Sequence, residues 1–339
     1  MEDKVIIIAE AGVNHNGNFE NAKKLIEAAA NAGADYVKFQ TFKADKLVSK
    51  DAELANYQKV SVENDDTQYK MLKKLEMPED WYFKLIEHSI KNGIKFLSTG
   101  FDEESIDFLE KYSVDFYKIP SGEITNKPLL IHIAKKGRPI VISTGMATMN
   151  DINNAIQVLL NNGVLNNNIT ILHCNTEYPT PMTDVNLSAM NKIKDEFNVN
   201  IGYSDHTLGI EVPIAAVALG AKIIEKHFTL DKNMEGPDHK ASLDPSELSL
   251  MVKSIRNISK AIGNGIKTPS ISEIKNIGIA RKSIHIKNNV SKGDLVTKED
   301  LIMLRPGDGI SPMDIDLVFN KKYKSNFLSG YKLTLKDLE

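Results

Sequence analysis

The stretch KIIEKHFTL, residues 222–230, decides the fold class. Its apolar residues are typical of a buried strand, yet Glu225, Lys226 and His227 stand in the middle of it. Burying an unpaired charge costs free energy, so the charges need a reason to be there. In parallel α/β folds, functional side chains lie at the carboxyl ends of strands. We therefore expect this strand to end in the wall of a functional site.

Seven further β-branched runs precede this strand and alternate with amphipathic stretches. The eight strands are expected at 5–11, 36–42, 95–100, 116–121, 139–144, 169–175, 199–204 and 222–229. The helices are expected at 19–32, 79–92, 103–112, 125–136, 148–162, 187–197, 210–219 and 245–262. Eight such units over about 250 residues favour a (β/α)8 or TIM barrel. A doubly wound open sheet is the alternative, but no G-x-G-x-x-G follows the first strand.

Capping residues support these boundaries. Asn18, Thr125 and Asp244 are expected as N-caps, and several helices end just before a glycine. The stretch 43–78 is longer than an ordinary βα loop, so we expect a lid or a partner contact at the barrel mouth.

The pattern changes after the eighth helix. The barrel is expected over residues 1–264, a linker over 265–282, and a small loop-rich β module over 283–339. A module of about 55 residues is near the lower limit for an independent core. We expect it to pack against another surface.

Composition excludes several classes of protein. The 339 residues are 42% hydrophobic and 26% charged, with a net charge of −3, which gives no signal for binding nucleic acid. The single cysteine, Cys174, excludes an internal disulfide and fits a reducing compartment. No apolar run approaches the ~18 residues of a membrane span, and the N-terminal stretch is not typical of a secretory signal. We expect a cytoplasmic protein without membrane contact.

Polar residues cluster at the carboxyl ends of all eight expected strands. One such residue is usually a rim charge or a core histidine, but a barrel brings eight strand ends to one pocket. The set is Glu10, Lys38, Gln40, Ser98, Thr99, Lys118, Ser121, Glu123, Ser143, Thr144, Asn175, Thr176, Ser204, Asp205, His206, Glu225, Lys226 and His227.

Two kinds of binding are expected in this pocket. His206 and His227 are on neighbouring strand ends, where two neutral imidazoles can share one divalent ion. Asp238 is a further candidate for charge there, and His15, on the first βα loop, could reach the pocket. Lysines and hydroxyls suit a carboxylate or phosphate, and no Walker-type loop is present. The sequence predicts a site for a small phosphorylated acid and a divalent metal.

Several motifs, in order along nearly the whole chain, resemble the sialic acid synthase family. They are IAEAGVNHNG (8–17), VKFQTF (37–42), YKIPSGEI (117–124), ISTGM (142–146), EYPTP (177–181), GYSDHT (202–207), EKHFT (225–229) and GPDH (236–239). ARKSIH (280–285) and LRPGDGISP (304–312) are similar to its C-terminal antifreeze-like (SAF) domain. Any one motif is weak, but the ordered set is highly specific.

The resemblance implies a transferase that joins phosphoenolpyruvate to an open-chain N-acetylated mannose-type sugar, giving a nonulosonic acid and phosphate. It implies a divalent metal, Mn²⁺ first and Mg²⁺ or Co²⁺ as alternatives, held by His206 and His227. It further implies a homodimer in which the SAF domain of one chain covers the barrel of the other and contributes Arg305. The remaining implied roles are proton transfer for Glu10 and Glu123, phosphoenolpyruvate binding for Lys38, Thr99, Lys118, Ser121, Ser143 and Ser204, and sugar contacts for Gln40, Tyr178 and Asp238.

One departure concerns the sugar. Family members that use N-acetylmannosamine have an Asn and an apolar residue before the Tyr-Pro of the sixth strand, whereas this chain has Thr176 and Glu177. Such variants resemble legionaminic acid synthases, which take 2,4-diacetamido-2,4,6-trideoxymannose. N-acetylneuraminate and pseudaminic acid synthases stay as alternatives, as does a related barrel acting on a sugar phosphate. A carbohydrate- or ice-binding protein is the alternative from another class, although the charged tail argues against ice binding.

Overall fold

The computed structural model describes residues 4–55 and 67–339. It divides into two compact units, Met1–Gly263 and Asn264–Glu339, which are treated separately below.

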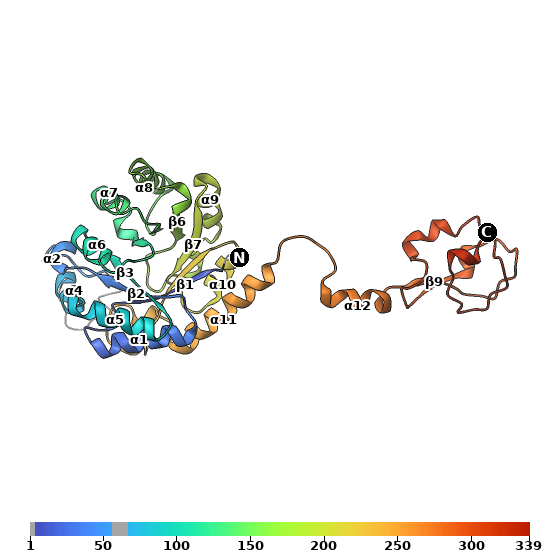
Figure 1. Ribbon diagram of the computed structural model, residues 1–339, viewed down its shortest axis with the longest axis horizontal. Helices are drawn as coiled ribbons and strands as arrows, with labels where there is room; N and C mark the ends of the chain where they lie inside the picture. The colour runs from blue at the N-terminus through green and yellow to red at the C-terminus, as the bar shows by residue number, and fades with distance from the viewer. Residues whose placement is uncertain (1–3, 56–66) are drawn as a thin grey trace. The chain divides into compact units, whose positions relative to one another are not determined.

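The first unit is built around eight parallel strands (Figure 1). Ladders join them in the order β3-β2-β1-β8-β7-β6-β5-β4, and β3 lies beside β4, so the sheet forms a nearly closed barrel. The barrel expected from the sequence is confirmed, and the open doubly wound sheet is wrong. The strands are β1 (Ile6–Gly12), β2 (Tyr36–Thr41), β3 (Lys95–Gly100), β4 (Tyr117–Ile119), β5 (Ile140–Ser143), β6 (Ile169–His173), β7 (Asn200–Asp205) and β8 (Ile223–His227).

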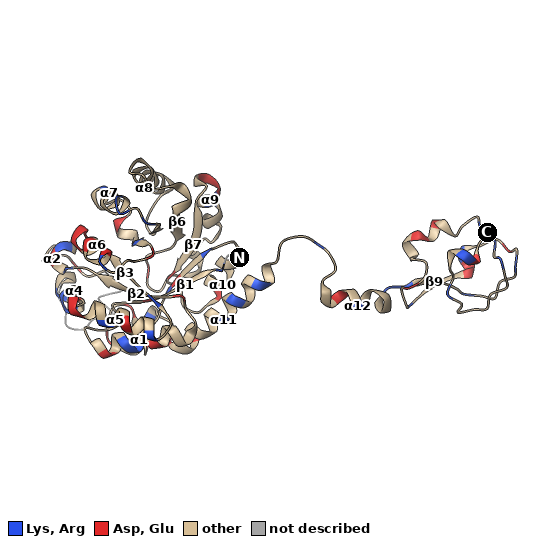
Figure 2. Ribbon diagram, in the orientation of Figure 1, with Lys and Arg blue, Asp and Glu red and all other residues tan. Residues whose placement is uncertain are grey.

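Helices surround the barrel (Figure 1), and residues of both charge signs occur along them (Figure 2). Asn18 and Asp244 cap their helices as expected, but the cap predicted at Thr125 is wrong, because Asn126 accepts the bond from Leu129 N. The helices are α1 (Phe19–Ala32), α2 (Ala44–Leu47), α4 (Gln68–Leu75), α5 (Glu79–Lys91), α6 (Glu103–Glu110), α7 (Lys127–Ala134), α8 (Met149–Asn161), α9 (Ser188–Phe197), α10 (Glu211–Ala218) and α11 (Pro245–Ile262).

The strands place apolar residues in two layers. Outward side chains such as Ile7, Ile142 and Ile224 pack in the main core, with the helices. The other face of the strands forms a separate cluster, which we call the barrel floor: Ile8, Tyr36, Leu97, Phe116, Val141, Leu172 and Ile223. Because side chains alternate along a strand, the residue two positions after each floor residue faces the same interior, nearer the carboxyl end.

The long stretch 43–78 holds α2 and α4. Met71 and Leu75 of α4 pack with Val13 and Phe42 beside the barrel. The expected lid includes residues 56–66, which lie outside the described residues, so the lid stays a prediction.

The second unit begins with α12 (Ile271–Ala280), a helix within the stretch expected as a linker. An antiparallel pair follows, β9 (Ser283–Ile286) with β10 (Leu301–Leu304). Ten buried residues form its own core, Val318, Tyr323 and Leu333 among them. Short 3-10 helices of both units are Ser121–Glu123, Asn166–Asn168, Met182–Asp184, His239–Ala241, Lys298–Asp300, Pro312–Leu317 and Leu335–Asp337. None of the described helices has the length and apolar character needed to cross a membrane.

Candidate active site

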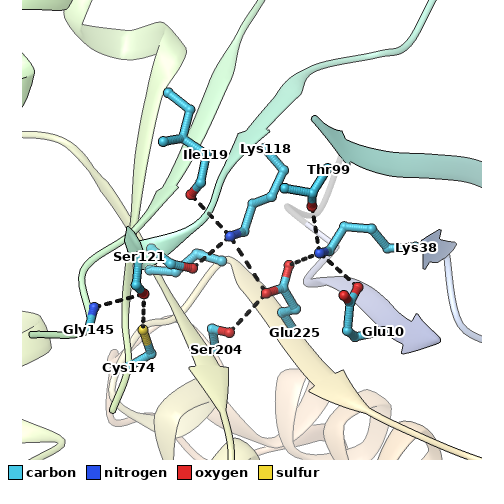
Figure 3. Close-up of polar contacts among 12 residues, drawn as sticks. Glu10, Lys38, Thr99, Lys118, Ile119, Ser121, Gly145, Cys174, Ser204 and Glu225 are labelled. Atoms are coloured by element: carbon cyan, nitrogen blue, oxygen red, sulfur yellow. Dashed lines mark hydrogen bonds and ion pairs between the residues drawn. The ribbon is translucent and has the colours of Figure 1, made fainter. Parts of the chain in front are cut away.

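Four buried charges of alternating sign form a chain at the carboxyl ends of four strands (Figure 3). Lys38 Nζ of β2 lies 2.7 Å from Glu10 Oε2 of β1 and 3.5 Å from Glu225 Oε2 of β8. The other oxygen of Glu225, Oε1, lies 3.7 Å from Lys118 Nζ of β4. Each charge therefore has an opposite partner, which offsets the cost of burying it.

Hydroxyl groups complete the surroundings of these charges. Lys38 Nζ donates to Thr99 Oγ1 at 2.9 Å, and Lys118 Nζ donates to Ser143 Oγ at 2.7 Å. Ser204 Oγ donates to Glu225 Oε1 at 2.9 Å. Hydroxyls can turn to donate or accept, so they can exchange these partners for the oxygens of an anion.

Burial and the neighbouring charges shift the pKa values in opposite directions. Burial raises the pKa of Glu10 to about 7, against the opposing effect of Lys38. Burial also acts to raise the pKa of Glu225, but Lys118 and Lys38 outweigh it and lower that pKa to about 2. Near neutral pH, Glu225 is therefore ionised while Glu10 can take up or release a proton.

Ser121 begins the turn that follows β4 and bonds across to the next two strands. Its hydroxyl accepts from Gly145 N at 3.0 Å and lies 3.2 Å from Cys174 Sγ. A Cβ at Gly145 would lie 2.4 Å from Thr176 Cγ2, so only glycine fits under this methyl group. The Thr176 methyl group therefore packs closely over Gly145, beside Ser121.

His206 and His227 lie together at the ends of β7 and β8, with ring centroids 5.5 Å apart. Tyr178 lies against both, with its ring 4.1 Å from His206 and 5.7 Å from His227. Burial lowers the pKa of both imidazoles, which keeps them neutral. The expected proximity of the two histidines is what the structure shows.

The donor chemistry of this pair fits a divalent cation. His206 Nδ1 donates to the backbone oxygen of Asn175, so its Nε2 carries the free lone pair. His227 Nδ1 is buried without a hydrogen bond in the described part of the chain, and Asp238 Oδ2 lies 3.9 Å from it. In that same part, no three His, Cys, Asp or Glu side chains form a ligand group.

Gly12 marks where the lysine side and the histidine side of the site meet. A Cβ there would have three side-chain neighbours: His227 Cε1 at 3.3 Å, Glu10 Oε1 at 3.4 Å and Gln40 Nε2 at 3.5 Å. The φ of +51° also favours glycine. Gln40 Nε2 further donates to Glu10 Oε1 at 3.4 Å. The charged chain and the two imidazoles therefore belong to one continuous site.

Three expected site residues are not joined to this cluster by the described contacts. Glu123 follows β4, half-buried, and accepts from Asn126 Nδ2 at 2.6 Å. Glu177 is exposed beside Tyr178. Arg305 follows β10 in the second unit, where it is exposed.

Some strand-end residues point away from the pocket. Asp205 and Lys226 pair with each other, and Thr144 Oγ1 donates to Leu172 O of the neighbouring strand. Placing these three in the pocket was wrong, because alternate residues of a strand face opposite sides. His15, which could have reached the site, is instead fully buried, with its ring near those of Phe39 and Trp81.

Sequence reasoning undervalued some residues that the structure brings into the site. Glu225 is the central carboxylate, and its position two residues before His227 already placed it on the same face of the strand. Cys174 and Gly145 carried no chemical signal of their own. Their contacts with Ser121 depend on how three strands meet.

A barrel whose mouth holds buried lysines, carboxylates and paired histidines, followed by a small second unit, defines a class. The chain belongs to the NeuB family, whose model matches residues 25–267, and a SAF domain matches residues 281–339. The N,N'-diacetyllegionaminic acid synthase of Campylobacter jejuni is 52% identical over 96% of this chain and 97% of the relative. That of Legionella pneumophila is 49% identical over 98% and 94%. The resemblance seen in the motifs is confirmed.

A solved structure of the same kind agrees with the fold. The N-acetylneuraminic acid synthetase of Leptospira borgpetersenii, crystallised with citrate, has a TM-score of 0.70 and 35% identity, and the match covers 81% of this chain and 90% of that one.

Proposed function

We propose that the protein condenses phosphoenolpyruvate with open-chain 2,4-diacetamido-2,4,6-trideoxymannose, giving N,N'-diacetyllegionaminic acid and phosphate. The observation that carries the sugar assignment is the 52% and 49% identity to two N,N'-diacetyllegionaminic acid synthases over nearly the full chain. Relatives that act on other sugars are less similar: a pseudaminic acid synthase of C. jejuni is 33% identical, and the human N-acetylneuraminate-9-phosphate synthase is 38% identical.

The lysine side of the pocket is assigned to phosphoenolpyruvate. Lys38 and Lys118 are buried cations from two strands, and each has a hydroxyl within 2.9 Å. The phosphate and carboxylate of phosphoenolpyruvate can take these donors in charge-assisted hydrogen bonds. The hydroxyls of this subsite come from Thr99, Ser121, Ser143 and Ser204.

Glu10 is assigned to proton transfer. The reaction needs a proton delivered to the sugar aldehyde oxygen and a proton removed from the water that adds to C2 of phosphoenolpyruvate. A group with a pKa near 7 can do either, and burial holds Glu10 there. Glu123 is the second candidate and lies in the turn that follows β4.

His206 and His227 are assigned to a divalent cation, Mn²⁺ first with Mg²⁺ or Co²⁺ as alternatives. Two neutral imidazoles with a fixed tautomer at His206 support this. Such an ion supplies Lewis-acid polarisation of the sugar aldehyde. The protein's own part is to hold the two rings, with Tyr178 packed against both.

The sugar is assigned to the side of the pocket formed by Gln40, Tyr178 and Asp238. Thr176 and Glu177 lie next to it along the chain, and the exposed carboxylate of Glu177 can accept from a 4-acetamido N–H. A hydrogen bond to a charged group contributes about 1.5–3 kcal/mol, or roughly 10- to 150-fold in specificity.

A homodimer in the cytoplasm, with the SAF unit of one copy over the barrel of the other, is part of the same proposal. Its support is the family membership and the exposed side chain of Arg305. Arg305→Ala should weaken use of the sugar more than binding of phosphoenolpyruvate, and light scattering should give the mass of two chains.

The decisive experiment is the mass of the product after incubation with phosphoenolpyruvate, Mn²⁺ and each of several sugars. The set contains 2,4-diacetamido-2,4,6-trideoxymannose, its stereoisomer used for pseudaminic acid, N-acetylmannosamine and N-acetylmannosamine 6-phosphate. The 2,4-diacetamido mannose should give the highest kcat/KM. A higher value with N-acetylmannosamine would overturn the sugar assignment, and no product with any sugar would overturn the synthase.

Two variants locate the specificity. In Glu177→Gln and Thr176→Asn, the ratio of kcat/KM for the diacetamido sugar to that for N-acetylmannosamine should fall. An unchanged ratio in both would remove these residues from the assignment and leave the preferred sugar as measured.

A further inference from the structure

A buried ion pair lies on the outer side of the barrel directly behind the two histidines. Asp205 of β7 and Lys226 of β8 are fully buried, and their Cα positions are paired in the ladder. The other outward positions of the eight described strands hold no Asp, Glu, Lys or Arg. Each member of the pair is adjacent in sequence to one histidine of the site, His206 or His227.

The pair belongs to a closed set of hydrogen bonds with Thr207. Lys226 Nζ donates to Asp205 Oδ2 at 2.5 Å and also to the backbone oxygen of Thr207. Asp205 Oδ1 accepts from Thr207 N at 3.1 Å and from Thr207 Oγ1 at 2.9 Å. These bonds join Asp205 and Thr207, the two residues that flank His206, to each other. They also join both of them to Lys226, the residue before His227.

This arrangement matters because β7 ends at Asp205. His206 lies beyond the last ladder pair between β7 and β8, so regular sheet bonding does not set its distance from β8. On its other side, His206 is held to the β6 loop, through Thr180 N to His206 O at 2.9 Å and through its own Nδ1 to Asn175 O. The hydrogen bonds of Asp205, Lys226 and Thr207 link the backbone around His206 to the strand that carries His227, while the Tyr178 ring packs against both imidazoles.

Stability alone does not account for charges at this place. A buried ion pair is often replaced by apolar residues without loss of stability, because desolvation offsets the attraction. Apolar residues fill the outward positions in register with Lys226 on the next two strands, Ala9 of β1 and Val37 of β2. A directional, multiply bonded group fixes geometry in a way that an apolar contact does not.

We propose that Asp205, Lys226 and Thr207 are positioning residues that hold the His206 and His227 imidazoles at the separation required to bind one divalent cation. The inference rests on the cation site of the proposed function. According to this inference, residues on the outer, helix-facing side of β7 and β8 influence the affinity of the site for the cation. Residues behind metal ligands commonly change affinity by about 10- to 100-fold when replaced.

The test uses the full chain, freed of metal and titrated with Mn²⁺ in the absence of substrates, with free Mn²⁺ measured by electron paramagnetic resonance. Asp205→Asn combined with Lys226→Met removes both charges together, so no unpaired buried charge remains. We expect Mn²⁺ affinity to fall by at least tenfold, and the visible spectrum of the Co²⁺-loaded protein to change. The matched control is Asp35→Asn combined with Arg256→Met, which removes an ion pair remote from the histidines. The control should leave Mn²⁺ affinity within twofold of wild type. The thermal midpoint of the Asp205, Lys226 double variant should change no more than that of the control.

His206→Ala separates the two levels of the proposal. If it leaves Mn²⁺ binding intact, the cation site itself is wrong. If it abolishes binding while the double variant binds Mn²⁺ like wild type, the positioning role is wrong and the cation site stands. Should the double variant fail to fold, Thr207→Val removes one hydroxyl and keeps both charges. It should weaken Mn²⁺ binding about threefold or more, and unchanged affinity there would overturn the positioning role.

Discussion

The mouth and the floor of the barrel are built by the same strands and differ in almost every property. On β1, Ile8 belongs to the floor and Glu10 to the mouth; on β8, Ile223 belongs to the floor and Glu225 to the mouth. The floor gains stability from buried apolar surface. The mouth holds charges whose burial is only offset by one another. Two residues along a strand therefore separate the apolar layer that stabilises the fold from the charged layer to which we assign the chemistry.

The largest effect should come from removing a charge at the mouth. Lys118→Met keeps the length of the side chain but removes its ammonium group, which bonds Ser143 and pairs with Glu225. Loss of two charge-assisted contacts at about 1.5–3 kcal/mol each predicts a fall in kcat/KM of roughly 10²- to 10⁴-fold. Steady-state kinetics with varied phosphoenolpyruvate concentration measure this fall in kcat/KM. A kcat/KM within tenfold of wild type would contradict the assignment of the chemistry to the charged mouth.

The matching change at the floor should have the reverse consequence. Leu97→Ala removes a fully buried side chain two residues before Thr99 and should lower the free energy of unfolding by about 2–5 kcal/mol. Activity of the folded protein should fall far less than in Lys118→Met, because Leu97, although it is the ladder neighbour of Lys38, supplies no charge and no hydrogen bond to the site. Urea unfolding and kinetics at low temperature check both halves. A Leu97→Ala variant that is as stable as wild type but inactive would show that this floor residue serves activity rather than stability.

The pH dependence of stability should sharpen the contrast at Glu10. Its pKa is about 7 in the folded protein, above the ordinary 4.5, because burial disfavours the charged form. The contribution of the protonated acid is complete below pH 4.5 and is lost as the pH rises through 7. The thermal midpoint of Glu10→Gln should therefore rise relative to wild type between pH 5 and pH 8. A difference that stays constant over this range would show that Glu10 does not titrate there.

The smallest effect is expected at the opposite end of the strands, with the opposite sign. Asp35 precedes β2 and accepts from Ile7 N at 2.8 Å and Arg256 Nη2 at 2.7 Å. Although burial acts against ionisation, Lys4 and Arg256 hold the pKa of Asp35 below 3.8. Its contribution is present above pH 3.8 and is lost as the pH falls. Asp35→Asn should be less stable than wild type at pH 7 and approach it below pH 4 in the same thermal scans.

The sequence predicts the barrel well because its signal is local. Strand and helix positions follow from alternation and periodicity, and the predicted strand at 222–229 corresponds to β8 at Ile223–His227. The Lys226 side chain can be buried on the outer side of the barrel because it pairs with Asp205 on the neighbouring strand, 21 residues earlier in the sequence. No local pattern shows that a lysine can be buried on the outer side until that partner is known.

Other differences have equally physical reasons. The sequence around Ser270 and Glu273 contains a capping box, which starts α12 inside the stretch expected as a linker. That signal was present but outweighed by the surrounding Gly, Pro and Ser residues. The two imidazoles were predicted together because neighbouring strands of a barrel are adjacent. The contacts of Gly12, Gly145 and Cys174 arise from close approach of several strands, which sequence spacing does not describe.

Cys174 has a practical consequence for anyone who wants to attach this protein to a surface or a dye. It is the only thiol of the chain, it is buried beside Ser121, and burial raises its pKa. Maleimides react with exposed thiolates, so the native protein should react with them only very slowly. A cysteine introduced on an outer helix would then be modified selectively, with no need to remove the native one from the pocket wall.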